Sequence, residues 1–234
     1  MSRHFVIVGG SRGLGRAFSV AMVAEGHAVS VLARSRGDVA GVMYHECDLD
    51  TIDAPTVLDA VSCAGGEIDA LACFQRYRGT SDEWAGEFQT TLTATKSLIE
   101  NSPRTFASHG LRSIVLVSSV NALFISPALP PGYHVAKAAL CQMARYYACT
   151  LGPLGIRVNA VCPSTFVKPE TERHYAARPD VVARLAAASP LGRMASYRDV
   201  NEAVGFLLGE RASFITGQTL VVDGGISLRW PEHL

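Results

Sequence analysis

The sequence predicts an α/β fold in which a single doubly wound parallel sheet of about seven strands carries helices on both faces. Short runs rich in valine, isoleucine and leucine alternate along the chain with longer segments whose apolar residues recur at helical spacing. The 234 residues contain no linker, repeat or low-complexity tract. One domain over residues 1–234 is therefore expected.

The composition limits the class of protein. Hydrophobic residues make up 48% of the chain, and Lys plus Arg equal Asp plus Glu, so the net charge is zero. This balance argues against a nucleic-acid surface built on bulk charge, and no apolar run approaches the length of a membrane span. The six scattered cysteines are interpreted as small buried residues in a reducing compartment, and the histidines lack metal-ligand spacing. With no signal peptide before the first strand, we expect a cytoplasmic protein without a metal, a nucleic-acid partner or a membrane partner.

The first expected strand, residues 6–8, runs directly into a glycine-rich turn and a helix. The stretch "VIVGGSRGLGRA" at 6–17 places four glycines after the apolar run, and helical spacing begins at Gly13. Glycine lets a phosphate approach the backbone, and the amides and dipole of a helix N-terminus favour a pyrophosphate. The turn therefore indicates a nucleotide site, although glycine-rich turns also occur for purely structural reasons. The residues expected to contact the nucleotide here are Gly9, Ser11, Arg12, Gly13, Leu14 and Gly15.

The second expected strand, residues 27–34, indicates which nucleotide binds. In dinucleotide folds an acidic residue at the end of this strand binds the ribose 2′-hydroxyl, whereas an arginine accommodates a 2′-phosphate. Ala33 stands where the acid would be, Arg34 and Ser35 follow, and Arg12 can approach from the other side. Each arginine would add a charge-assisted bond worth roughly 1.5–3 kcal/mol. The pattern therefore favours NADP(H); the alternative is that these are ordinary surface arginines.

The remaining segments continue the alternation of strands and helices. The link to the third strand, 41–48, is about seven residues, shorter than a normal parallel crossover, so no helix is expected there. Ser81 is expected to cap the helix over 81–100, with Trp84 on its buried side. Residues 164–190 are polar and are expected to be irregular. Further strands are expected at 69–74, 112–119, 156–163 and 218–225, and further helices at 51–65, 133–151 and 196–208.

Three residues have the chemistry needed to interconvert a carbonyl and an alcohol. The motif "YHVAK" places Tyr133 and Lys137 four residues apart, on one face of a helix. A tyrosine hydroxyl ordinarily titrates near pH 10, and an ammonium beside it favours the phenolate, which suits proton exchange near neutral pH. Ser119 ends the fifth strand at the carboxyl edge of the sheet, where doubly wound folds bind ligands. Its hydroxyl can hold the reacting oxygen.

With these motifs the whole chain resembles the short-chain dehydrogenase/reductase family, and its last part resembles the ketoacyl-reductase branch. The resemblance implies a Rossmann-like fold and NADPH-dependent reduction of a ketone to a secondary alcohol. In this scheme Ser119 orients the carbonyl, Tyr133 donates the proton and Lys137 also binds the nicotinamide ribose. Asp48 faces the adenine, with Leu49 beside it. The residues that carry the resemblance are Gly9, Gly13, Gly15, Asp48, Ser119, Tyr133, Lys137, Asn159, Pro163 and Asp223.

The resemblance also bears on partners and on the substrate side of the site. It places Pro163 among the cofactor contacts and residues 164–190 as a lid over a small-molecule carbonyl substrate. It implies a homodimer or homotetramer that pairs the two long helices on either side of the fifth strand. Residues 143–151, "MARYYACTL", are expected to expose tyrosines suited to that packing.

The chain departs from the family pattern at several positions. Val8 replaces a threonine, Cys-Phe-Gln-Arg at 73–76 replaces Asn-Asn-Ala-Gly, and Lys168 stands at a usual threonine position. Thr91 takes the place of an asparagine that serves a proton relay, so we include it among the catalytic candidates. Two alternatives to a reductase therefore stay open. One is an NADP-binding regulator without turnover, and the other is a non-redox lyase or isomerase that uses Tyr133 as a base.

Arginines near the expected active site indicate the kind of ketone. Arg76 and Arg78 follow the fourth strand, and the lid segment has few large apolar residues. Burial of each large apolar side chain is worth roughly 1.5–3 kcal/mol, so a lid for a fully apolar substrate would carry more of them. We therefore expect a polar ketone, anionic or polyoxygenated, with Arg76 as a substrate contact; the alternative is that these charges only solvate the outer face of the lid. The charged lid residues nearest the start of this segment are Lys168, Glu170, Glu172, Arg173, His174 and Arg178.

Overall fold

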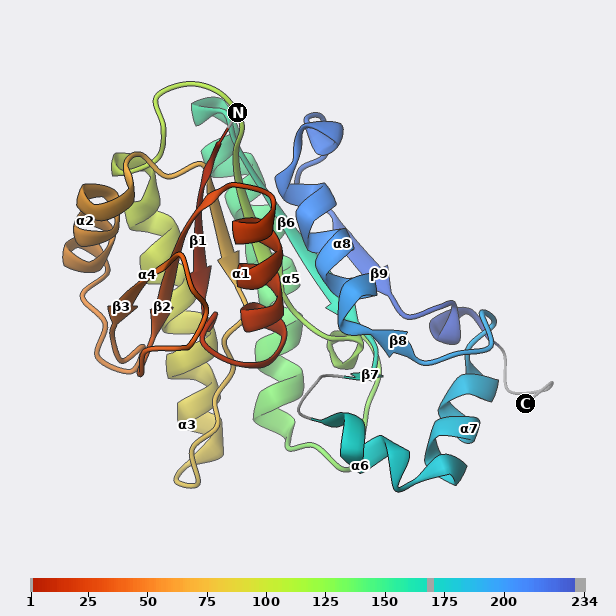
Figure 1. The fold of residues 1–234 in the computed structure, drawn as a ribbon. Helices are drawn as coiled ribbons and strands as arrows, with labels where there is room; N and C mark the ends of the chain where they lie inside the picture. The colour runs from red at the N-terminus through yellow and green to blue at the C-terminus, as the bar shows by residue number, and fades with distance from the viewer. Residues whose placement is uncertain (1, 168–170, 230–234) are drawn as a thin grey trace.

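Seven strands form one sheet in the order β3–β2–β1–β4–β5–β6–β9 (Figure 1). The computed structural model describes residues 2–167 and 171–229. Every neighbouring pair in this sheet is parallel, so the predicted doubly wound parallel sheet is confirmed. The strands are β1 (His4–Val8), β2 (Ala28–Ala33), β3 (Val42–Glu46), β4 (Ala70–Cys73), β5 (Arg112–Val117), β6 (Ile156–Pro163) and β9 (Thr219–Val222).

Helices cover both faces of the sheet. They are α1 (Gly13–Ala24), α2 (Ala54–Gly65), α4 (Ala94–Asn101), α5 (Pro131–Leu151) and α8 (Tyr197–Leu208). Alternate side chains of a strand point to opposite faces, so β1 sends Val6 and Val8 into one core and Phe5 and Ile7 into the other. The first core is closed by α2, α4 and α5, and the second by α1 and α8 (Figure 1). Within the described ranges, no helix combines the length and the apolar character needed to cross a membrane.

The segment between β4 and β5 is helical, but it is divided into three parts. α3 (Glu83–Glu87) leads into a π-helical turn, Phe88–Thr93, which leads into α4. A π turn holds one residue more than an α turn, and such turns are frequent at functional sites. The predicted single helix over 81–100 is therefore correct in extent and wrong in its winding.

Two details predicted for the start of this helix are wrong. The cap is Asp82 and not Ser81, because the Asp82 carboxylate accepts a hydrogen bond from the Ala85 amide at 3.0 Å. Trp84 does not face the core: it is 49% exposed and stacks on Phe88, with 4.8 Å between the ring centroids. The two rings cover each other on the surface.

The link between β2 and β3 contains no helix, as predicted. It is held in place by two side-chain contacts. Asp38 forms an ion pair with Arg16 of α1, at 2.7 Å from its Nε, and the Val39 amide donates a hydrogen bond to the Tyr44 hydroxyl of β3 at 3.0 Å. These contacts fix the short link against α1 and β3 without a helix.

The segment 164–190 is more regular than predicted. β7 (Phe166–Val167) pairs with β8 (Ala195–Ser196), and two helices, α6 (Glu172–Ala176) and α7 (Pro179–Ala188), follow β7. In Figure 1 these helices project beyond the carboxyl edge of the sheet, below α8. Lys168 and Glu170, predicted members of the lid, lie outside the described residues.

Short 3₁₀ turns and the cysteines complete the description. The turns are Ser102–Arg104, Val120–Ala122, Gly152–Leu154, Glu210–Ala212 and Ile226–Leu228. The prediction that the cysteines are buried holds for Cys73, Cys141 and Cys162 but is wrong for Cys63 and Cys149, which are exposed on helix surfaces. All six cysteines are free thiols.

Candidate active site

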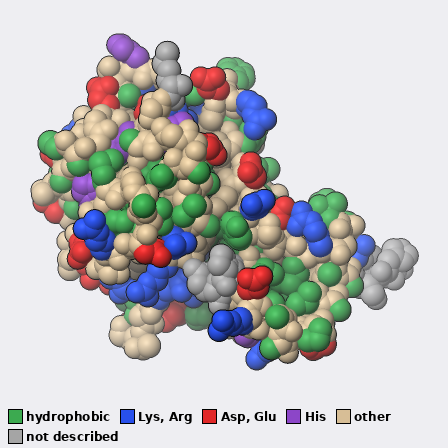
Figure 2. Space-filling view, in the orientation of Figure 1, with side chains coloured by type: hydrophobic (Ala, Val, Ile, Leu, Met, Phe, Trp, Pro, Cys, Tyr) green, Lys and Arg blue, Asp and Glu red, His purple; other side chains and the backbone are tan. Residues whose placement is uncertain are grey.

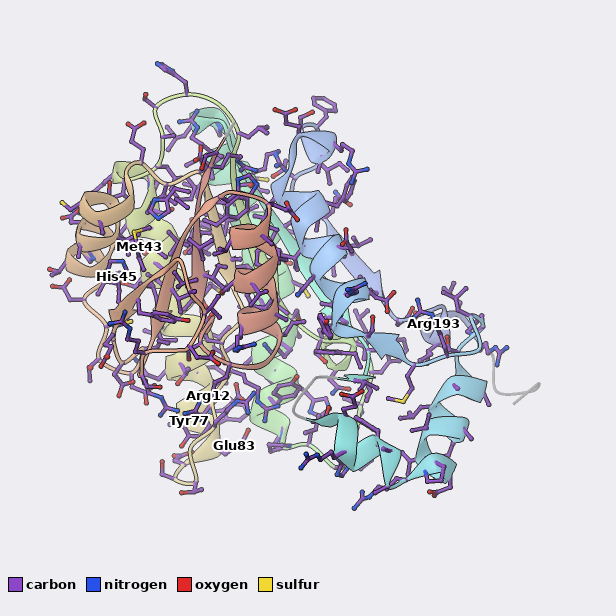
Figure 3. The ribbon with its side chains drawn as sticks, in the orientation of Figure 1. Arg12, Met43, His45, Tyr77, Glu83 and Arg193 are labelled. Atoms are coloured by element: carbon purple, nitrogen blue, oxygen red, sulfur yellow. The ribbon has the colours of Figure 1, made fainter. Side chains whose placement is uncertain are left out.

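A cavity of about 850 Å³ opens at the carboxyl edge of the sheet. The chain winds in opposite directions on either side of β1, and ligands bind at such a switch point. Figure 2 shows basic side chains gathered at this edge, and Figure 3 labels Arg12 there. The predicted site residues that line the cavity are Gly9, Ser11, Arg12, Leu14, Gly15, Arg34, Ser35, Asp48, Leu49, Arg76, Ser119, Tyr133, Lys137 and Pro163.

The glycine turn after β1 fits a diphosphate. Gly9 has a φ of +76°, a conformation that side chains disfavour, and a Cβ at Gly15 would lie 2.5 Å from the Gly9 carbonyl oxygen. Helix α1 therefore begins directly against the turn, with no acidic side chain in its first turn to neutralise its positive end. Gly13, with a φ of +58°, shapes the turn but is not among the residues that line the cavity.

Two arginines flank the part of the cavity next to the end of β2. Arg12 and Arg34 are both exposed, and within the described ranges neither has a carboxylate partner. Arg16, one turn further along α1, is instead engaged by Asp38. A dinucleotide with an added phosphate on its ribose would meet two available cations here, and the turn and this flank together fit such a nucleotide.

Ser119 and Tyr133 approach the cavity from neighbouring elements. Strand β5 ends at Val117, so Ser119 lies two residues beyond the strand rather than at its end as predicted. Its Oγ accepts a hydrogen bond from the Asn121 amide at 3.2 Å and caps the short turn that follows. Tyr133 lies half-buried in the first turn of α5. This placement directs a hydroxyl and a phenol into one cavity.

Two cations lie against the ring of Tyr133. The Lys137 Nζ is 5.8 Å from the ring centroid, and the guanidinium carbon of Arg76 is 5.4 Å from it. Lys137 is buried, and its ammonium donates a hydrogen bond to the Val117 carbonyl at 3.0 Å. Burial, with a smaller contribution from Arg76, lowers the pKa of Lys137 to about 8, whereas the carboxylate of Glu87 acts in the opposite direction.

Thr91 occupies a different place from the other catalytic candidates. Its side chain is fully buried in the π-helical turn and does not line the cavity. The Thr91 hydroxyl donates a hydrogen bond to Oε2 of Glu87 at 2.7 Å, and its carbonyl accepts one from the Thr95 hydroxyl at 2.7 Å. Its contacts are therefore with a buried polar network beneath the cavity.

Sequence reasoning missed two polar residues of this network. Gln75 lines the cavity and donates from Nε2 to the Thr95 hydroxyl at 2.6 Å, while its Oε1 is buried with no partner among the described residues. Glu87 is only 3% exposed. Buried polar atoms are normally paired, so the free Gln75 oxygen is suited to accept a hydroxyl proton of a ligand. From the sequence alone, Gln75 and Glu87 are expected to be exposed polar residues. The large apolar residues close to Glu87 in the sequence are the one signal that it could be buried.

Among the described residues of the lid, no charged side chain lines the cavity. The described lid residues that do are Ser164, Thr165, Phe166, Thr171 and Tyr175, all uncharged, whereas Glu172, Arg173, His174 and Arg178 are exposed. The lid charges therefore solvate its outer face, and the argument for a polar substrate rests on Arg76 and Arg78, which do line the cavity.

A second cavity, of about 240 Å³, adjoins the first beneath the lid. It shares Val120, Ser164 and Thr165 with the larger cavity. Apolar side chains make up much of its wall, so a substrate held at Ser119 could extend an apolar substituent into it. These side chains are Leu185, Leu191, Met194, Val222 and Ile226.

Comparison with known proteins agrees with this geometry. The model of a family described as enoyl-(acyl carrier protein) reductase matches residues 8–227. The chain is 30% identical to the 3-oxoacyl-(acyl-carrier-protein) reductase FabG of Salmonella typhimurium, with 94% of this chain and 96% of that protein covered. The chain belongs to the short-chain dehydrogenase/reductase family. This oxidoreductase family acts with nicotinamide cofactors on small molecules.

Two further comparisons support the family assignment over the whole chain. The 3-oxoacyl-(acyl-carrier-protein) reductase MabA of Mycobacterium avium is 29% identical, with 97% of this chain and 91% of that protein covered. The ligand-free structure of the aldohexose dehydrogenase of Thermoplasma acidophilum superimposes with a TM-score of 0.87 at 27% identity, covering 98% of this chain and 96% of that one. The family fold therefore extends from β1 to β9.

Proposed function

We propose that this short-chain dehydrogenase/reductase uses NADPH to reduce a ketone to a secondary alcohol. The observation that carries the proposal is the position of Tyr133, half-buried in the cavity wall with the Lys137 ammonium against its ring and Ser119 nearby in the same wall. A phenol beside a buried cation is suited to release a proton, which a hydride-accepting carbonyl needs.

The chain's own residues divide the work at the carbonyl. The Ser119 hydroxyl donates a hydrogen bond to the carbonyl oxygen and fixes its position. Tyr133 donates its hydroxyl proton to that oxygen as the alcohol forms, and the ammonium of Lys137 stabilises the phenolate left behind. When bound, NADPH supplies the hydride. The lid over 164–190 and the apolar side cavity exclude water from the reacting carbon.

The remaining site residues are assigned to the cofactor. Gly9, Ser11, Gly13, Leu14 and Gly15 form the diphosphate turn. Asp48 and Leu49 border the adenine, Pro163 the nicotinamide end, and Lys137 also holds the ribose next to it. The extra phosphate of NADPH is assigned to Arg12, Arg34 and Ser35, whose availability at the end of β2 supports this choice over NADH.

The proposal extends to the substrate and to the surroundings of the enzyme. Arg76 lies against the Tyr133 ring, which supports a polar ketone with an anionic or hydroxylated group close to the carbonyl. The six free thiols support a reducing compartment, and we assign the protein to the cytoplasm. A homodimer or homotetramer through α4 and α5 is the assembly that we expect.

The Tyr133→Phe variant tests the proposed reaction. Removing only the hydroxyl should leave folding and NADPH binding intact and reduce turnover by roughly the 10²–10⁴-fold typical of a lost general acid. NADPH oxidation with a panel of ketones gives the rate, and nucleotide fluorescence gives the dissociation constant. Tyr146→Phe, on the exposed face of the same helix, serves as the matched control and should be fully active. Near-normal turnover of Tyr133→Phe would refute the role of the hydroxyl.

A further inference from the structure

Two buried side chains beneath the cavity carry opposite formal charges. Lys137 of α5 and Glu87 of α3 are each 3% exposed. Transfer of a single charge into a protein interior is costly unless an opposite charge or several hydrogen bonds accompany it. The Lys137 ammonium has one hydrogen bond with the described residues, to the Val117 carbonyl, which leaves most of that cost uncompensated.

The carboxylate of Glu87 is fixed by the winding of its own helix. Glu87 is the last residue of α3, and the π-helical turn begins directly after it. This turn places Thr91 so that its hydroxyl donates to Oε2 of Glu87 at 2.7 Å. The Thr95 hydroxyl donates to the Thr91 carbonyl at 2.7 Å and accepts from Gln75 at 2.6 Å, so a continuous set of hydrogen bonds connects the cavity wall to the carboxylate.

We propose that Glu87 is a positioning residue that keeps Lys137 protonated, its buried carboxylate providing the counter-charge and Thr91 holding that carboxylate in place. The two charges form no direct ion pair among the described residues, so Glu87 acts through its field across a poorly solvated interior, where charges interact strongly. The proposal rests on the proposed function, in which the Lys137 ammonium stabilises the Tyr133 phenolate.

The other groups around Lys137 either oppose its positive charge or act on it more weakly than Glu87. Arg76 faces it from the loop after β4 and opposes the positive charge. The thiols of Cys141 of α5 and Cys162 of β6 act in the same direction as Glu87 but contribute less, Cys73 of β4 also faces Lys137, and Tyr133 lies on the same helix as Lys137. Among the charged groups that influence Lys137, Glu87 is the carboxylate, and it opposes the fall in the pKa of Lys137 caused by burial.

A direct titration of Lys137 tests the proposal without any substrate. The chain has three lysines, Lys96, Lys137 and Lys168, so labelling lysine with ¹³C at Cε produces three signals that can be assigned with Lys96→Arg and Lys168→Arg. Glu87→Gln removes the charge while its amide oxygen can still accept the Thr91 hydroxyl. The titration midpoint of Lys137 should fall by about one pH unit, a tenfold loss of proton affinity.

The matched control is Glu83→Gln, one turn earlier in α3. Glu83 is half-buried and its Oε1 lies against Gly132, and it is not among the groups that influence Lys137. The control should leave the midpoint of Lys137 unchanged. A midpoint in Glu87→Gln equal to that of the unmodified protein would overturn the proposal. If Glu87→Gln fails to fold, Glu87→Met replaces it, because methionine has no polar atom that needs a hydrogen-bond partner. The titration midpoint of Lys137 is expected to fall by the same amount.

Enzyme assays separate this proposal from the proposed function. If both are correct, the alkaline limb of the rate profile for ketone reduction moves to lower pH in Glu87→Gln, and activity recovers on acidification. A shifted Lys137 titration in a protein that reduces no ketone would support the counter-charge and refute the reductase. An active enzyme whose alkaline limb and Lys137 titration both stay in place would refute the counter-charge alone.

Discussion

Tyr133 is in contact with cations from two distant parts of the chain. Lys137 comes from the next turn of the same helix, whereas Arg76 comes from the loop after β4. The sequence places Arg76 where the family usually has glycine, so a position normally without a side chain here carries a guanidinium. This substitution places a positive charge beside the Tyr133 ring.

The choice between NADPH and NADH depends on Arg34. Arg34→Ala should weaken NADPH binding about tenfold or more, the equivalent of one charge-assisted hydrogen bond, and should leave NADH binding nearly unchanged. Arg36→Ala is the matched control, because Arg36 is an equally exposed neighbour that lies over the Tyr44 ring and does not line the cavity. Dissociation constants for both nucleotides decide the matter, and equal losses for the two would show that Arg34 does not contact the 2′-phosphate.

The selectivity for the ketone depends on Arg76. Arg76→Ala should raise the KM for a ketone with a carboxylate near the carbonyl by tenfold or more, while the KM for its neutral amide analogue changes little. Steady-state rates on the two substrates provide the comparison. NADPH affinity is measured alongside, since a loss confined to the nucleotide would reassign Arg76 to the cofactor diphosphate.

At the scale of single residues, the sequence predicts side chains that the structure brings to one cavity, such as Tyr133 and Lys137, but it misses the polar residues Gln75 and Glu87. The "YHVAK" motif identifies Tyr133 and Lys137 because helical spacing brings them to one face. Glu87 could not be found in this way, because a glutamate in a helix ordinarily faces water and its burial follows from how α3 packs on α5. Long-range packing is decided by the whole fold and leaves little trace in the local pattern.

At the scale of elements, regular strands were predictable and irregular winding was not. The apolar runs identify all seven strands of the sheet because a parallel strand covered on both faces needs apolar side chains throughout. The π-helical turn at Phe88–Thr93 and the two lid helices were missed. The helical period changes by only one residue at the π turn, and the lid helices bury few side chains, so neither leaves a clear apolar pattern.

The amino-terminal half of the sheet carries two histidines that are wholly or partly buried, His4 and His45. On β1, His4 bonds to the Gly66 carbonyl and to the Ser30 hydroxyl, each at 2.9 Å. On β3, His45, labelled in Figure 3, has a buried Nε2 without a partner among the described residues. Burial lowers the pKa of both, and that of His27 as well.

These histidines predict that acid weakens the fold. Because their pKa values are lowered in the folded state, the unfolded chain binds more protons below about pH 6.5, and stability declines as pH falls. Above that pH their contribution is fully present. Each histidine lowers the free energy of unfolding by at most about 1.4 kcal/mol per pH unit. Urea unfolding between pH 7.5 and pH 5 measures the decline, and His45→Phe should make it shallower; an identical slope in that variant would exclude His45.

At the scale of the whole molecule, α4 and α5 present the face on which an assembly would form. The prediction that residues 143–151 expose tyrosines is correct for Tyr146, which is 60% exposed, and wrong for Tyr147. Tyr147 is buried, and its hydroxyl donates to Glu100 at 2.9 Å, which ties α5 to α4 within one chain. The exposed part of this face is therefore narrower than the sequence indicates.

We expect a dimer or tetramer in solution at micromolar concentration. Light scattering coupled to size exclusion gives the mass directly, against 24.9 kDa for one chain. Tyr146→Glu, which places a charge in the middle of the face, should shift the mass towards the monomer because a buried unpaired carboxylate is costly. A monomeric mass for the unmodified protein would contradict the expected assembly.

The extra residue in the π-helical turn determines how α3 is rotated about the helix axis relative to α4. Each residue advances an α-helix by about 100°, so one added residue turns α3 relative to α4 by that angle. With this offset α4 directs Ala94 and Leu98 into the core while α3 directs Glu87 towards α5. Loss of one residue from the turn would restore an unbroken α-helix. Either Glu87 would then turn away from α5, or Ala94 and Leu98 would turn away from the core. One half of this helical segment therefore packs in the core, and the other half carries the carboxylate that we propose as the counter-charge of Lys137.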